Sequence, residues 1–202
     1  MKRKIEAVLK EWKHQKKHLP LVIRGARQVG KSFVVEAFGQ SEFDHRVTIN
    51  FEKPPEIKSC FKKRDPNAIL TALNIVLETK IVPGKTLLFL DEIQECPDAL
   101  MALRYFYEEC PSLHVIAAGS LLEFVLNAPD FRMPVGRIQY LYLRPLSFEE
   151  FLEAHGQDDF LTQCRKATLQ SGIDDSVHEK GIEWVRRYMA VGGMPDVVQD
   201  YL

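Results

Sequence analysis

Hydrophobic positions along the first part of the chain form short apolar runs that alternate with stripes of helical spacing. Apolar runs predict strands at 19–24, 45–51, 86–90, 114–120 and, as an alternating run, 138–143. Apolar residues three and four apart predict helices over 2–17, 33–38, 66–79 and 97–110. Gly39 is interpreted as the end of the helix 33–38, and the basic stretch 58–64 as a connection. This alternation favours an α/β fold with a parallel sheet.

Beyond residue 146 the pattern is only helical, with segments expected over 148–154, about 160–170 and 182–191. Ser147 and Glu150 have the spacing of a capping box at the start of the first of these helices. With 202 residues, the chain can form one core and a small second part. We therefore expect a core over 1–146 and a helical part over 147–202.

A complete phosphate-binding motif, G-x-x-x-x-G-K-S, lies between the first strand and the following helix. Its glycines allow the backbone N–H groups to converge on a phosphate, and the helix start adds its unsatisfied donors. Lys31 can reach the β- and γ-phosphates, and the Ser32 hydroxyl can ligate Mg²⁺. The motif predicts a nucleotide site made by Gly25, Ala26, Arg27, Gln28, Val29, Gly30, Lys31, Ser32 and Phe33.

Two adjacent carboxylates, Asp91 and Glu92, follow the apolar strand 86–90. Ligands of open parallel sheets bind at the carboxyl ends of strands, and a cation there would offset the charge. We expect Asp91 to contact Mg²⁺, directly or through water, and Glu92 to polarise the water that attacks the γ-phosphate. The alternative is a pair of helix N-cap carboxylates. Ser120, at the end of the strand 114–120, could bond that water or the γ-phosphate, or cap a helix over 121–126.

Composition excludes several classes of protein. The net charge of −1 gives no general attraction to nucleic acid or anionic membranes. The four cysteines are far apart, which fits a reducing cytosol, and no apolar run has the length of a membrane span, so we expect a cytoplasmic protein. The first helix could still contact nucleic acid, although its basic residues more often form a solvated face: Lys2, Arg3, Lys4, Lys10, Lys13, Lys16 and Lys17.

The ensemble resembles the AAA+ superfamily of P-loop ATPases. More narrowly, it resembles the bacterial and archaeal AAA-type ATPases that carry a C-terminal domain of uncharacterised function. The motifs that support this resemblance are the phosphate loop 25–32 and the stretches 90–94 (LDEIQ), 143–151 (LRPLSFEEF) and 192–195 (GGMP). The resemblance implies a three-layer α/β/α sandwich on a five-stranded parallel sheet of order 5-1-4-3-2, with a partial helical lid.

The resemblance also implies roles for single residues. It places Lys31 and Ser32 on phosphate and Mg²⁺, Asp91 on Mg²⁺, Glu92 as catalytic base and Ser120 as sensor of the γ-phosphate. Asn50 is similar to a residue that holds the catalytic glutamate away from water, or it satisfies backbone groups at a strand end. Arg137 is a candidate for an arginine that acts on a neighbouring subunit, or it forms a surface ion pair.

Members of this group continue into a second domain, so this chain is expected to be the N-terminal ATPase part. Formation of a homo-oligomer is left as an open possibility. The function expected is hydrolysis of Mg-ATP to ADP and phosphate to drive a conformational change, slowly in isolation. The resemblance implies that the bound nucleotide carries adenine and not guanine. Two alternatives are an ATP-gated switch with little hydrolysis and a nucleic-acid-associated ATPase module.

Overall fold

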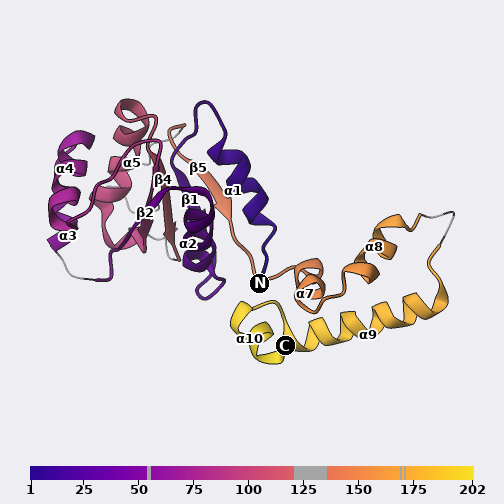
Figure 1. Cartoon of the computed structure of the whole chain (residues 1–202). Helices are drawn as coiled ribbons and strands as arrows, with labels where there is room; N and C mark the ends of the chain where they lie inside the picture. The colour runs from indigo at the N-terminus through magenta and orange to yellow at the C-terminus, as the bar shows by residue number, and fades with distance from the viewer. Residues whose placement is uncertain (54–55, 121–135, 169, 171) are drawn as a thin grey trace. The chain divides into compact units, whose positions relative to one another are not determined.

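Five parallel strands form a central sheet in the computed structural model of the chain (Figure 1). They run in the order β2-β3-β4-β1-β5, which is the expected order 5-1-4-3-2 counted from the other edge. The three-layer α/β/α P-loop fold is thereby confirmed. The strands are β1 (Leu21–Arg24), β2 (His45–Asn50), β3 (Thr86–Asp91), β4 (His114–Gly119) and β5 (Gln139–Tyr142).

The structure describes residues 1–53, 56–120, 136–168, 170 and 172–202. These divide into two compact units. The sheet unit contains Ala7–Leu143, and the helical unit contains Met1–Glu6 together with Arg144–Leu202. The first six residues thus group with the end of the chain, which the sequence pattern gave no reason to expect.

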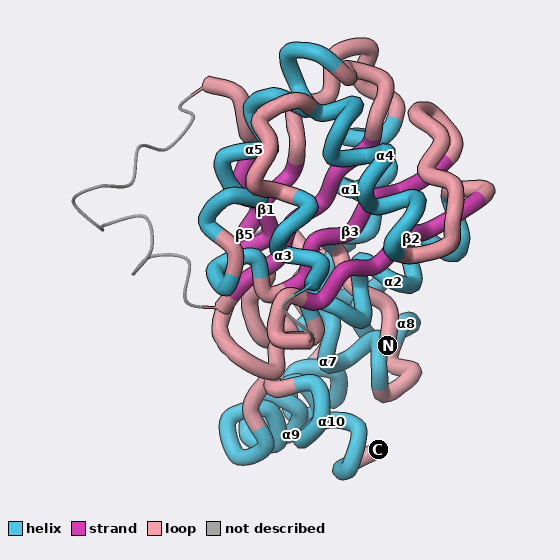
Figure 2. The backbone as a smooth tube through the Cα atoms, turned by 90° about the vertical axis from the view of Figure 1, so that its left-hand side faces the viewer, coloured by secondary structure: helices cyan, strands magenta, loops and turns pink. Residues whose placement is uncertain are grey.

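Helices cover both faces of the sheet (Figure 2). α1 (Ile5–Lys13) and α2 (Lys31–Glu42) lie on one face, where Trp12 packs against Phe38. The other face is covered by α3 (Glu56–Cys60), α4 (Pro66–Val76) and α5 (Pro97–Glu109), whose apolar residues share a core with Val22 and Leu88. Strands β3 and β4 are buried along their whole length, as expected for central parallel strands.

Two local predictions from the sequence were wrong. α2 continues through Gly39 to Glu42, and Gly39 is buried within it. A Cβ atom at Gly39 would lie 2.9 Å from a methyl carbon of Leu87, so this glycine permits close packing of the helix on the sheet and does not end the helix. The stretch 58–64 is also not a simple connection, because α3 extends into it and Cys60 and Phe61 are buried.

The helical unit contains α7 (Phe148–Ala154), α8 (Asp158–Lys166), α9 (Asp175–Val191) and α10 (Pro195–Tyr201). Its core is built from Leu146, Phe151, Leu152, Leu161, Trp184 and Val198. Gly193 is required by close packing, since a Cβ there would lie 2.3 Å from the carbonyl oxygen of Leu146. None of the described helices has both the length and the apolar character needed to cross a bilayer.

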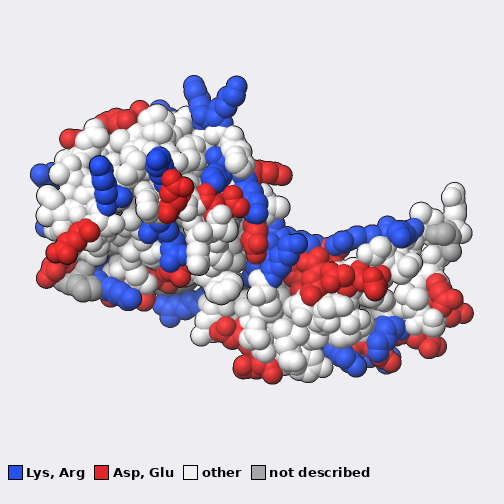
Figure 3. Space-filling view, viewed as in Figure 1, with Lys and Arg blue, Asp and Glu red and all other residues white. Residues whose placement is uncertain are grey.

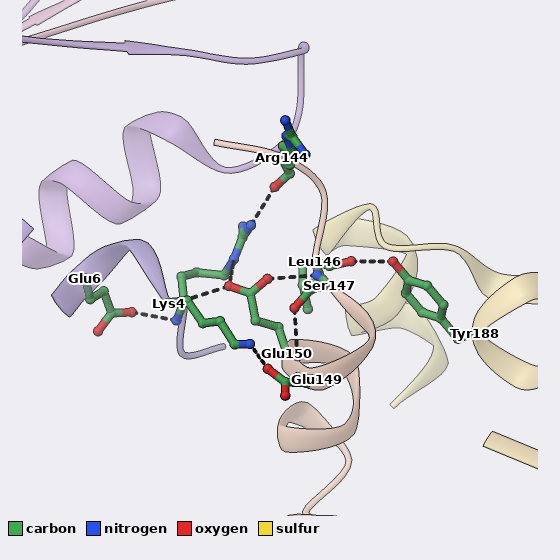
Figure 4. Close-up of polar contacts among 9 residues, drawn as sticks. Lys4, Glu6, Arg144, Leu146, Ser147, Glu149, Glu150 and Tyr188 are labelled. Carbon is green, nitrogen blue, oxygen red and sulfur yellow. Dashed lines mark hydrogen bonds and ion pairs between the residues drawn. The ribbon is translucent and has the colours of Figure 1, made fainter. Parts of the chain in front are cut away.

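The predicted capping box at the start of α7 is present and carries a buried ion pair (Figure 4). Ser147 accepts a hydrogen bond from the Glu150 amide, while the Glu150 carboxylate accepts from the Ser147 amide at 2.8 Å. Arg3 donates from Nε to the same carboxylate at 3.1 Å, and the two side chains are 5% and 7% exposed. Burial raises the pKa of Glu150, but the backbone donors of Ser147 and Lys4 and the charge of Arg3 outweigh it and lower this pKa overall.

Candidate nucleotide-binding site

The phosphate loop joins β1 to α2, and its backbone explains the glycine positions. A Cβ atom at Gly25 would lie 2.2 Å from the carbonyl oxygen of Leu143, so no larger residue fits. Gly30 has a left-handed backbone (φ 85°) at the N-cap of α2, and Gln28 is also left-handed (φ 62°). Such turns point successive N–H groups to one side of the loop, which is the geometry that binds a phosphate.

A pocket of about 390 Å³ lies at this loop. Seven of the residues that line this pocket were predicted from the sequence, six of them from the phosphate-binding motif and Glu92 as the base. They are Arg27, Gln28, Gly30, Lys31, Ser32, Phe33 and Glu92. Val29, within the loop, is fully buried. Glu52 also lines the pocket and was missed. Glu52 could have been predicted from its position directly after the strand 45–51, because that strand end lies at the same edge of the sheet as Asp91.

Lys31 is buried at the base of the loop, with 6% of its surface exposed. Its ammonium donates hydrogen bonds to the carbonyl oxygens of Gly25 (3.0 Å) and Ala26 (2.7 Å). Burial lowers the pKa of Lys31, and the negative charges of Glu92 and Asp91 partly oppose this effect. The loop therefore holds one cation close to two carboxylates.

Ser32 and Asp91 join the two sequence motifs. The Ser32 hydroxyl donates a hydrogen bond of 2.8 Å to Oδ2 of Asp91, which lies 59 residues further along the chain. Asp91 is 6% exposed, and its burial raises the pKa of the carboxyl group, against the lowering effect of this hydrogen bond. A buried carboxylate of this kind is stabilised when a cation binds beside it.

The donor set fits a magnesium ion. Mg²⁺ prefers oxygen ligands and usually takes one or two from the protein and the rest from phosphate and water. The Ser32 hydroxyl and the Asp91 carboxylate supply two such oxygens. Within the described residues there is no cluster of three His, Cys, Asp or Glu side chains able to hold a metal. The nucleotide would therefore have to complete the coordination.

Glu92 and Ser120 lie at the same edge of the sheet, at the ends of the neighbouring strands β3 and β4. Glu92 has a left-handed backbone (φ 50°), and its carboxylate accepts a hydrogen bond of 2.6 Å from the side-chain amide nitrogen of Gln94. The Ser120 hydroxyl is buried and has no hydrogen-bond partner in the described part of the chain. An unpaired buried hydroxyl is costly unless a ligand completes it. The helix expected over 121–126, which Ser120 would cap, lies outside the described residues.

Asn50 and Arg137 make local contacts. Asn50 pairs in register with Asp91, and its side-chain oxygen accepts a hydrogen bond from the Glu52 amide at 2.9 Å. Arg137 donates to Glu108 at 3.0 Å in an exposed ion pair. These contacts agree with the backbone and surface roles left open above. A catalytic part for either residue stays a prediction.

The basic residues of the first helix are partly neutralised. Lys10 and Lys13 contact Glu42, Lys10 at 3.1 Å and Lys13 at 3.4 Å, and Lys4 pairs with Glu149. Lysine and arginine side chains lie beside acidic ones on the face drawn in Figure 3. This mixture resembles an ordinary solvated surface more than a stripe that follows a nucleic-acid backbone.

The fold and this pocket define a nucleotide-binding module of the P-loop type. The AAA domain family matches residues 17–152, and the chain belongs to that family. No curated protein matches the chain.

Two solved structures of the ORC2 protein of Aeropyrum pernix are similar to the chain. The structure of its ADPNP–ADP complexes is 15% identical, with a TM-score of 0.49, over 77% of this chain and 52% of that one. The ADP form is 17% identical, with a TM-score of 0.45, over 77% and 51%. The chain thus spans about half the length of these structures.

Proposed function

We propose that this protein binds Mg-ATP in the pocket at the phosphate loop and hydrolyses it to ADP and phosphate. The observation that carries the proposal is the hydrogen bond between Ser32 and Asp91, which brings the phosphate loop and the acidic strand end into one site. Two hard oxygen donors, a buried lysine and a pocket-lining glutamate are the groups that phosphoryl transfer to water requires.

Each residue has a distinct part in the proposed reaction. Glu92 accepts a proton from the water as its oxygen attacks the γ-phosphorus, and the bond from that phosphorus to the β,γ-bridging oxygen breaks. Lys31 leaves the carbonyls of Gly25 and Ala26 for the β- and γ-phosphates, where its charge stabilises the transition state. Bound by Ser32 and Asp91, Mg²⁺ would neutralise phosphate charge. Ser120 would donate its hydroxyl to the γ-phosphate.

The nucleotide base is proposed to lie beside Phe33. This side chain lines the pocket although it is 64% exposed, which is unusual for an aromatic residue at the start of a packed helix. A base stacked on its ring would cover that apolar surface. Adenine is proposed from the family membership.

A nucleotide-driven conformational change is proposed to begin at the phosphate loop. Only a glycine at position 25 leaves room for the carbonyl oxygen of Leu143, and the Leu143 amide donates to the Arg24 carbonyl at 2.8 Å. The helical unit resumes at the next residue, Arg144. A shift of the loop on binding phosphate would therefore act on the chain where this unit, the proposed partial lid, begins. Exposure of Trp184 to a soluble quencher, compared with ATP and with ADP in a Trp12→Phe background, would report such a change.

Binding and turnover must be measured separately. Lys31→Ala should weaken Mg-ATP binding at least about tenfold, whereas Glu92→Gln should keep binding and lose about 10²–10⁴ in turnover, the usual contribution of a general base. Glu95→Gln is the matched control, because Glu95 is an exposed carboxylate three residues away. An unchanged rate of phosphate release from Glu92→Gln would exclude its role as base, and unchanged binding by Lys31→Ala would exclude the pocket.

Turnover by the isolated chain is proposed to be slow and to rise with assembly. An arginine supplied in trans is worth roughly 10³–10⁵ in turnover, and Arg137 is the proposed source. Mixing Lys31→Ala, which retains Arg137, with Arg137→Ala, which retains the site, should restore part of the activity. Fast turnover by a strictly monomeric sample would contradict this proposal.

A further inference from the structure

The turn after β3 begins with a residue in an unfavourable backbone conformation. Glu92 adopts a left-handed backbone (φ 50°, ψ 47°), which is unfavourable for a residue with a Cβ atom. A single turn of 3₁₀ helix, η1 (Ile93–Glu95), follows at once. Such backbone strain persists only where the surroundings enforce it, and it is concentrated at functional sites.

Gln94, on this turn, is bonded to the proposed base. Its Nε2 donates to Oε2 of Glu92 at 2.6 Å, which is short for a nitrogen donor and is typical of a charge-assisted bond. Within the described part of the chain, this is the only hydrogen bond of the Glu92 carboxylate. Its second oxygen therefore remains to accept the proton of a nucleophile in the pocket that Glu92 lines.

The orientation of the Gln94 amide follows from its neighbours. Its Oε1 is buried and has no hydrogen-bond partner among the described residues. Exchanging the nitrogen and the oxygen would place a carbonyl oxygen against a carboxylate, which is repulsive, so the nitrogen must face Glu92. Leaving Oε1 unpaired costs free energy. The chain tolerates this cost in order to keep the amide at Glu92.

The backbone of the turn does not need this side-chain bond. The Glu95 amide donates to the Glu92 carbonyl at 3.0 Å, and the Cys96 amide donates to the Ile93 carbonyl at 3.0 Å. Ile93 is fully buried and Cys96 is 3% exposed, so both ends of the turn are held by the core. A purely structural role for the Gln94 amide is therefore superfluous.

We propose that Gln94 is a positioning residue for hydrolysis: its amide holds the Glu92 carboxylate at the pocket wall with one oxygen free for the attacking water. This inference rests on the proposed ATPase function. In this proposal Gln94, and not Asn50, orients Glu92. The side-chain oxygen of Asn50 accepts a hydrogen bond from the Glu52 backbone amide instead. Since Gln94 does not line the pocket, its effect should fall on catalysis and not on nucleotide affinity.

The test is a double-mutant cycle on Gln94 and Glu92, with kcat and KM for Mg-ATP hydrolysis both measured on the full chain. Gln94→Met keeps the length of the side chain but removes the donor. It should lower kcat about tenfold or more while KM stays within about twofold, because a misoriented base loses transition-state stabilisation only. Gln94→Glu, which is isosteric and places a like charge beside Glu92, should lower kcat further. Glu95→Gln, exposed on the same turn, is the control expected to match wild type.

The double variant decides how Gln94 acts. If Gln94 works through Glu92, adding Gln94→Met to Glu92→Gln should slow hydrolysis by no more than about twofold. Losses that multiply, an effect confined to KM, or unchanged kcat in both Gln94 variants would each overturn the positioning role while the ATPase function stands. Wild-type turnover by Glu92→Gln would instead overturn the proposed base, and the role of Gln94 with it.

Discussion

The imidazole rings of His18 and His114 stack face to face, with centroids 3.8 Å apart and planes inclined by 6°. Both residues are buried, and the ring of Trp12 packs edge-on against each of them. The Nε2 of His114 donates to the carbonyl of Lys13 at 3.2 Å, while its buried Nδ1 has no partner in the described residues. Burial, followed by the proximity of His18, lowers the pKa of His114 to about 4.

This stack predicts acid sensitivity of the sheet unit. Because the pKa of His114 is depressed on folding, the unfolded chain binds more protons than the folded chain between pH 6.5 and about 4. Its effect is negligible above pH 6.5, and falling pH should remove about 3 kcal/mol of stability across this window. Denaturant unfolding at several pH values should show this loss in wild type and a much smaller one in His114→Phe. His45→Gln, which changes an exposed histidine, should keep the wild-type slope.

The sequence predicted the sheet and most of the site because both depend on local patterns. Strand β3 is a continuous apolar run that ends in Asp91, and the phosphate loop has a fixed spacing. Gly39 was misread because its reason is a contact with Leu87, on a strand far along the chain. Gln94 ends the stretch 90–94, but no role was predicted for it, because its bond to Glu92 depends on the left-handed turn between them. What the sequence could not indicate were contacts set by packing.

The contact of Arg3 is another that the sequence could not indicate, and its ion pair gives a second prediction. The basic set of the first helix was interpreted mainly as a solvated face, yet Arg3 is 5% exposed and bonds Glu150, 147 residues away. Arg3→Ala would leave Glu150 buried without its cation, which costs about 3–5 kcal/mol. Lys4→Ala is the matched control, since Lys4 and its partner Glu149 are 51% and 39% exposed and such a pair contributes less than about 1 kcal/mol.

The two tryptophans allow this prediction to be measured in each unit. Trp184 is buried in the helical unit and Trp12 in the sheet unit. In a Trp12→Phe background, fluorescence of Trp184 should show that Arg3→Ala lowers the unfolding midpoint of the helical unit. In a Trp184→Phe background, the midpoint reported by Trp12 should change less. Equal destabilisation by Arg3→Ala and Lys4→Ala would contradict the importance of burial.

We expect the ionised Asp91 carboxylate to destabilise the free chain and to be needed for binding Mg-ATP. Its raised pKa means that the ionised carboxylate is disfavoured in the folded chain, so the stabilising contribution is present at low pH and is lost as pH rises through the folded value. Without nucleotide, Asp91→Asn should therefore be at least as stable as wild type at pH 7. With Mg-ATP, wild type should gain thermal stability and Asp91→Asn should gain less. A fall in stability of the free variant, or an equal gain with Mg-ATP, would argue against this account.

Gly25 should tolerate no side chain, for a reason of packing. A Cβ atom there would lie 2.2 Å from the carbonyl oxygen of Leu143, which is backbone held by the hydrogen bond from the Leu143 amide to Arg24. Gly25→Ala must therefore displace the phosphate loop or strand β5, and overpacking of this kind costs about 1–3 kcal/mol. Because the proposed site binds phosphate through the loop amides, Mg-ATP affinity should fall at least about tenfold, a loss of about 1.4 kcal/mol.

A glycine with open space around it provides the comparison for Gly25. Gly84 has a left-handed backbone (φ +82°), and no atom lies within 4 Å of the position that its Cβ would take. Gly84→Ala bears only the conformational cost of about 1–2 kcal/mol. Its Mg-ATP affinity, measured by titration calorimetry, should match wild type. If Gly25→Ala bound Mg-ATP like Gly84→Ala, contact with Leu143 would not be what shapes the loop. A selective loss at Gly25 would instead show that the close approach of two strand ends holds the phosphate site in its binding geometry.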